Sequence, residues 1–126
     1  MRYVRTGDEL SIRASFLGDN RAMEQTTREP KRAEIEALPG PTLLEFGTSW
    51  CGHCRRAQPM IAQALAAHPE VRRIKVEDAS GKRLGRSFGV KLWPTLVFLK
   101  DGKEIEKLVR PTSVEEIARA LEAIGA

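Results

Sequence analysis

Aromatic residues, cysteines and long apolar runs are all scarce in this chain. Aromatic residues make up 6% of the 126 residues, and the arginines are scattered along the sequence. A nucleic-acid-binding surface combines clustered basic residues with aromatic ones, so the composition excludes nucleic acid as the primary partner. No apolar run approaches the roughly 20 residues that cross a membrane, so no membrane contact is predicted.

The remaining composition is typical of a globular protein, with 41% hydrophobic residues, 30% charged residues and a formal net charge of +4. This length fits one domain whose core needs no disulfide bonds. The positive charge indicates a mildly basic, solvated surface. Asp8, Glu9 and Arg13 interrupt the stretch where a secretory signal would need continuous apolar residues, so we expect a cytoplasmic protein. A mature fragment of an exported protein would look the same.

Helical and strand patterns alternate along most of the chain. Apolar segments predict strands over 42–46, 71–76, 95–99 and 104–109, and apolar faces and caps predict helices over 30–38, 52–67, 81–88 and 113–124. Because the first strands alternate with helices, they should pair in parallel. Asp101-Gly102 predicts an antiparallel hairpin between the last two strands. The order predicts a mixed sheet with helices on both faces.

The pattern is weakest over residues 1–28. Ser11–Phe16 alternates weakly and predicts an edge strand, followed by a turn at Gly18-Asp19-Asn20. A loosely ordered extension is the alternative, and Met23 is an alternative start site. We divide the chain into an extension over 1–28 and one domain over 29–126.

The two cysteines, Cys51 and Cys54, lie three positions apart at the predicted start of a helix. A helix N-terminus favours the thiolate, which is the form that attacks a disulfide. One turn further on the same face, Cys54 can attack the mixed disulfide formed on Cys51 and release the reduced substrate. This spacing predicts dithiol–disulfide exchange.

Half of a zinc site is the alternative interpretation of this spacing, because Cys-X-X-Cys also binds zinc. Such a site needs two more ligands, and the only histidines are His53 and His68. His53 lies inside the motif and would chelate awkwardly. We therefore expect no metal and no cofactor other than the redox-active Cys51–Cys54 disulfide.

Glu45 interrupts the apolar residues of the predicted strand 42–46, which ends just before the cysteines. A desolvated carboxyl group has a raised pKa and could take the proton of Cys54. Glu45 is therefore the candidate base. The alternative is an edge residue whose carboxylate reaches water.

Two segments, Leu44-Glu45-Phe46 and Trp50-Cys51-Gly52-His53-Cys54, resemble the thioredoxin superfamily, and Cys-Gly-His-Cys is most similar to the catalytic domains of protein disulfide isomerases. Pro59, Trp93-Pro94-Thr95 and Gly102 match the family's helix kink, cis-proline segment and hairpin turn. The resemblance covers residues 30–124. It implies an α/β thioredoxin fold, with a central mixed sheet of four to five strands and helices on both faces.

The resemblance also implies roles for individual residues. It assigns catalysis to Cys51, Cys54, Glu45, His53 and Pro94, and substrate binding to Trp50, Gly52, Trp93 and Thr95. We add Arg110 to the candidate substrate-binding residues because of its position on the docking surface. A cis bond before Pro94 would expose the Trp93 backbone beside the thiols, where a substrate strand can pair. Trp50 is expected to cap the thiols, or else to be a half-exposed loop aromatic.

Two departures from the family pattern affect these expectations. Gly47 stands where family members often have an aromatic residue, which predicts looser packing under the active-site loop. Arg110-Pro111 replaces small residues on the family's docking surface, which favours acidic substrates.

The activity that the resemblance implies is reduction of protein disulfides by a monomeric thioredoxin-like thiol–disulfide oxidoreductase in cell redox homeostasis. A thioredoxin-reductase-like or glutathione-linked donor would restore the dithiol. His53 in place of proline, if partly protonated, would stabilise the Cys51 thiolate and place the potential between about −270 mV, as in thioredoxin, and about −180 mV, as in protein disulfide isomerase. The alternatives are a non-catalytic thioredoxin-fold binding module and, in an exported protein, a disulfide oxidase or isomerase.

Overall fold

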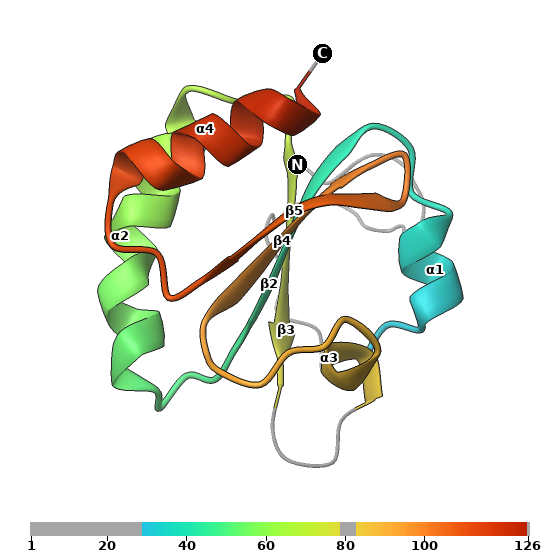
Figure 1. The fold of residues 1–126 in the computed structure, drawn as a ribbon, viewed down its shortest axis with the longest axis horizontal. Helices are drawn as coiled ribbons and strands as arrows, with labels where there is room; N and C mark the ends of the chain where they lie inside the picture. Colours follow the sequence, from blue (N-terminus) through green and yellow to red (C-terminus); the bar gives the residue numbers. More distant parts are fainter. Residues whose placement is uncertain (1–28, 79–82, 126) are drawn as a thin grey trace.

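The computed structural model describes residues 29–78 and 83–125, and Figure 1 shows how their elements are arranged. The helices are α1 (Arg32–Glu36), α2 (Gly52–Ala66), α3 (Arg83–Ser87) and α4 (Val114–Ile124). The strands are β2 (Pro41–Gly47), β3 (Arg72–Glu77), β4 (Thr95–Lys100) and β5 (Lys103–Val109). The strand predicted over Ser11–Phe16 and the predicted helix start at Gly81 lie outside the described residues.

The four strands form one mixed sheet in the order β3-β2-β4-β5. β2 pairs in parallel with β3, and β4 pairs antiparallel with both β2 and β5. The predicted mixed sheet and hairpin are confirmed, with Asp101 and Gly102 both at positive φ.

We predicted parallel pairing for the strands that alternate with helices, and this prediction is wrong for β4, which is antiparallel to β2. Thr95, at the start of β4, pairs with Phe46 near the end of β2, so β4 begins at the edge of the sheet where β2 and β3 finish. The five residues of α3 span only about 7 Å, too little to return the chain along a strand of about 20 Å.

Helices cover both faces of the sheet, as predicted: α2 and α4 lie on one side and α1 and α3 on the other (Figure 1). Successive residues of a strand point to opposite faces. Leu43 therefore belongs to the core under α2 and α4, whereas Leu44 and Phe46 belong to the core under α1 and α3. By the same alternation, Glu45 lies on the face covered by α2.

The helix ends agree with the sequence prediction at some positions and differ at others. α1 begins at Arg32, two residues after the predicted Pro30, because the Glu34 carboxylate accepts the Lys31 N–H at 2.8 Å and closes the first turn there. α2 begins within the motif, as predicted, and contains Pro59.

At α4, Ser113 is the N-cap as predicted, and its Oγ accepts the Glu116 N–H at 3.1 Å. The predicted capping box is incomplete, because the Glu116 carboxylate accepts the N–H of Thr112, at 2.9 Å, instead of that of Ser113.

Candidate active site

Cys51 is the N-cap residue of α2, so its sulfur lies where the first amide groups of the helix are unpaired. Its backbone is extended, with φ −83° and ψ 122°, and its Sγ accepts the Cys54 N–H at 3.3 Å. Both cysteines are thiols. Cys51 is 9% exposed and Cys54 is 5% exposed, so the first sulfur is the more accessible of the two.

The surroundings of the two thiols shift their pKa values in opposite directions. Burial acts to raise the pKa of Cys51, but hydrogen bonds from Cys54 and His53, together with the charge of Arg110, leave that pKa lowered. Burial, the hydrogen bond to Cys51, and the charges of Cys51 and Glu45 raise the pKa of Cys54 to about 12. The site therefore favours a thiolate at Cys51 and a thiol at Cys54.

The segment before β4 lies beside the motif. The Trp93–Pro94 peptide bond is cis, as predicted. The Trp93 ring packs edge-on against Trp50, with centroids 5.5 Å apart, and its Nε1 donates to Asp78 Oδ2 at 2.8 Å. Thr95 is buried, and its hydroxyl donates to the Leu92 carbonyl at 2.6 Å. These bonds hold the backbone of Trp93 in place next to the thiols.

Trp50 and Gly52 lie on the surface around Cys51. Trp50 is 66% exposed, so it is not buried over the thiols and its ring contacts Trp93 instead. A Cβ added at Gly52 would meet no atom within 4 Å, so the surface beside Cys51 is open.

His53 differs from the sequence prediction in its charge. It is exposed, and its Nδ1 faces Arg56 Nη2 at 3.2 Å. Since a guanidinium group can only donate, Nδ1 accepts and the ring is neutral. The charge of Arg110, then burial and then Arg56 lower the pKa of His53. These contacts oppose the partial positive charge that we considered for His53, and Arg110 is a cation that acts on Cys51.

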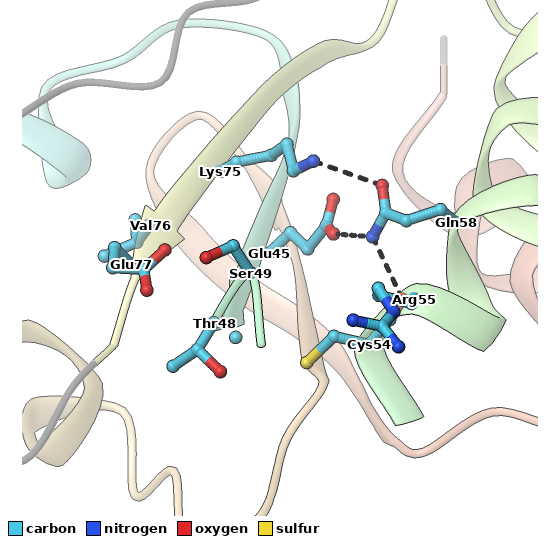
Figure 2. A pocket seen from close by; sticks show the side chains of 10 residues that line it. Glu45, Thr48, Ser49, Cys54, Arg55, Gln58, Lys75, Val76 and Glu77 are labelled. Carbon is cyan, nitrogen blue, oxygen red and sulfur yellow. Dashed lines mark hydrogen bonds between the residues drawn. The ribbon is translucent and has the colours of Figure 1, made fainter. Parts of the chain in front are cut away.

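Glu45 is 4% exposed and lies in a network of polar side chains between β2, β3 and α2 (Figure 2). Its Oε1 accepts from Arg73 Nη2 at 2.8 Å and from Arg73 Nε at 3.0 Å, and its Oε2 accepts from Gln58 Nε2 at 2.6 Å. Gln58 Oε1 accepts in turn from Arg73 at 2.7 Å and from Lys75 at 3.2 Å. Glu45 is thus a buried, ion-paired carboxylate, and the alternative of an edge residue open to water is wrong.

A cavity of about 220 Å³ connects this network to the second thiol. Glu45, Thr48, Cys54, Gln58 and Lys75 are among the residues that line it, and Figure 2 shows their side chains around the same space. The hydroxyl of Thr48 is buried there without a hydrogen-bond partner among the described residues. The cavity offers a route along which Glu45 and Cys54 can exchange a proton.

Sequence reasoning missed Arg73, Gln58 and Lys75. The available signal was the pair of basic residues two apart in a predicted buried strand, which places both on one face. Their meeting with Glu45 depends on the β2–β3 register, in which Glu45 is opposite Lys75 and Leu43 is opposite Arg73.

Gly47 packs against the second thiol, contrary to the looser packing that we expected. A Cβ at Gly47 would lie 2.6 Å from the Cys54 sulfur, which is too close for any side chain. The glycine therefore allows the sulfur to approach the end of β2.

Residues 29–78 and 83–125 contain no group of three or more acidic, histidine or cysteine side chains that could hold a metal ion. No helix in the described part of the chain is both long enough and apolar enough to cross a membrane.

Comparison with known proteins agrees with this geometry. Residues 22–123 match the family model described as Thioredoxin. A curated thioredoxin, Asp f 28 of Aspergillus fumigatus, is 30% identical over 87 residues, which are 69% of this chain and 81% of that protein. The thioredoxin of Chlamydia trachomatis is 37% identical over 70 residues, 56% of this chain and 69% of that protein.

Among solved structures, that of reduced thioredoxin 2 from Pseudomonas aeruginosa PAO1 is 54% identical, with a TM-score of 0.71. The alignment covers 79% of this chain and 92% of that one. The chain therefore belongs to the thioredoxin family of thiol–disulfide oxidoreductases.

Proposed function

We propose that Cys51 is the attacking thiolate and Cys54 the resolving thiol in the reduction of protein disulfides. The observation that carries this assignment is the asymmetry of the pair: the Cys51 sulfur caps α2 and accepts an amide N–H, while Cys54 is more buried and its pKa is raised to about 12. The Cys51 sulfur attacks one sulfur of the substrate, the substrate S–S bond breaks, and the leaving sulfur takes a proton.

The second step releases the substrate and uses Cys54. Cys54 gives up its proton, attacks the Cys51 sulfur and forms the Cys51–Cys54 disulfide, and the second substrate sulfur leaves. Two electrons have then passed to the substrate. Glu45 is the proton acceptor that we infer for this step, because it lines the same cavity as Cys54 and its charge acts on that thiol.

Substrate binding is assigned to the surface around Cys51. The exposed Trp50 and the open Gly52 flank Cys51 in the chain, and the Trp50 ring contacts Trp93 of the cis-proline segment. A substrate strand would pair with the backbone of Trp93, which Thr95 and Pro94 hold in place.

We also infer the electron donor, the oligomeric state and the cellular compartment, on the basis of the family. A thioredoxin-reductase-like or glutathione-linked donor returns electrons to the Cys51–Cys54 disulfide, and no further cofactor is involved. The protein acts as a monomer in the cytoplasm, with residues 1–28 as an extension of the domain over 29–126.

An insulin reduction assay with dithiothreitol tests the assignment. The wild type should accelerate reduction, and Cys51→Ser should abolish that acceleration. Cys54→Ser should retain the first step and accumulate a mixed disulfide on Cys51 that mass spectrometry can identify. A Cys51→Ser variant that reduces insulin at the wild-type rate would show that another group attacks, while binding without thiol-dependent turnover would favour a binding module.

A further inference from the structure

Arg110 contacts the segment where a substrate strand would pair, and its charge acts on Cys51. Its Nε donates to the Trp93 carbonyl at 2.8 Å, and its backbone N–H donates to the Pro94 carbonyl at 2.9 Å. The side chain is exposed, and its charge lowers the pKa values of both Cys51 and His53. One guanidinium group therefore acts on the attacking sulfur and on the docking backbone together.

The backbone of Arg110 is in a conformation that favours glycine, with φ at +50°. A side chain in the left-handed region costs free energy that glycine would avoid. Strain of this kind is characteristic of functional sites, where the surrounding contacts maintain it. The bond to Trp93 is such a contact, which points to a role for the arginine side chain itself.

Strand pairing at Trp93 requires the carbonyl that Arg110 occupies. This oxygen has two lone pairs, so an incoming substrate N–H can bond to it beside Arg110 Nε or in its place. In either case the exposed guanidinium group of Arg110 lies beside the paired substrate segment, and it has further N–H groups that can donate to that segment. A carboxylate on the substrate can accept two of these N–H groups in bidentate geometry, whereas a neutral side chain forms a weaker bond and a basic one is repelled.

The charges around Cys51 favour the same class of substrate. Arg55 and Arg56 are also exposed, near the start of α2. We propose that Arg110 is a specificity-determining residue that selects protein disulfides whose attacked cysteine is flanked by acidic residues. This inference rests on the proposed role of Cys51.

Matched peptides provide the test. Each peptide carries one disulfide, and the residues flanking the attacked cysteine are acidic, amide or lysine in otherwise identical sequences. With dithiothreitol as the electron source, kcat/KM of the wild type should be about threefold to fivefold higher for the acidic peptide than for the amide peptide, as for an exposed ion pair. Added salt should reduce this preference.

The ratio of kcat/KM between the acidic and amide peptides reports recognition separately from the reactivity of Cys51, because the same Cys51 attacks every peptide. Arg110→Gln should bring the ratio close to one, and Arg110→Lys should restore part of the preference. The control is Lys100→Gln, which removes one positive charge at the far end of β4 and should keep the wild-type ratio. Thermal unfolding of each variant checks that it is folded.

The results also distinguish a failure of the role of Arg110 from a failure of the proposed role of Cys51. Equal kcat/KM for all peptides with the wild type, or an unchanged ratio in Arg110→Gln, would overturn the role of Arg110 and leave Cys51 in place. Failure of the wild type to reduce any peptide or insulin would overturn the proposed site and the role of Arg110 with it.

Discussion

At the scale of single residues, the two thiols show how neighbours decide reactivity. They are one turn apart in the sequence, yet the pKa of Cys51 is lowered and that of Cys54 is raised to about 12. Helix amides and Arg110 favour the first anion, while burial and nearby negative charges oppose the second. Charge on His53 is not needed for this difference.

Alkylation of the reduced protein by iodoacetamide should report the Cys51 thiolate. Because the pKa of Cys51 is lowered, the rate should remain high below the value of about 8.5 for a free cysteine and fall as pH drops through the folded pKa. Arg110→Gln should move the midpoint upward, since it removes a cation that lowers this pKa. A larger upward shift in His53→Gln than in Arg110→Gln would contradict the neutral state of His53.

Gly47 matters because it has no side chain. Gly47→Ala places a Cβ 2.6 Å from the Cys54 sulfur, so the sulfur or the end of β2 must shift. We expect the free energy of unfolding to fall by about 1–3 kcal/mol, as for other overpacked sites, in guanidinium denaturation. Gly52→Ala, with open space around its Cβ, is the matched control for stability. Equal stability of the two variants would mean that the Gly47 contact relaxes without cost.

At the scale of elements, β2 and β3 bring a buried carboxylate and a cationic side chain together. Glu45 faces α2, and the parallel register places Arg73 and Lys75 beside it. Gln58 on α2 completes the set. The network ties the helix that carries the thiols to the strands beneath it.

Arg73→Met should expose the importance of this ion pair. The substitution leaves the Glu45 carboxylate buried without its cation, which typically costs about 3–5 kcal/mol. Guanidinium denaturation measures the loss, and Glu45→Gln combined with Arg73→Met should be less destabilised than Arg73→Met alone. If the double variant loses the sum of the two single losses, the pair makes no specific contribution.

Glu45→Gln also tests the proton step. Because the amide cannot accept the Cys54 proton as a carboxylate does, release of the substrate should slow while the first attack continues. Quenched-flow mass spectrometry should then find more mixed disulfide on Cys51 than in the wild type. Uniform slowing of both steps would instead indicate a structural role.

At the scale of the whole molecule, the sheet separates two cores and presents the site at one edge. α2 and α4 cover one face, and α1 and α3 cover the other (Figure 1). The ends of β2 and β3 and the start of β4 meet at the same edge. This arrangement brings the motif, the cis-proline segment and Arg110 to one surface.

A chain that starts at Glu29 should fold and retain insulin reduction, because both faces of the sheet are covered by helices within the described residues. We expect one cooperative unfolding transition and an activity within about twofold of the full chain, as for a complete domain. Loss of the transition on removing residues 1–28 would show that this segment belongs to the domain.

Features that depend on neighbours along the chain could be predicted from the amino-acid sequence. The spacing of Cys51 and Cys54, the start of α2, the Asp101-Gly102 hairpin and the Trp93-Pro94 segment are all local. Each depends on backbone preferences within a few residues, so a single sequence is enough to predict them.

The groups that surround the thiols come from distant parts of the chain, and the folded arrangement is needed to identify them. Arg73 reaches Glu45 across 28 positions, and Arg110 reaches Trp93 across 17. These contacts depend on strand register and on a left-handed backbone at an arginine, neither of which local propensity specifies. A cation that lowers the pKa of Cys51 therefore comes from Arg110, a residue far from the motif in the sequence.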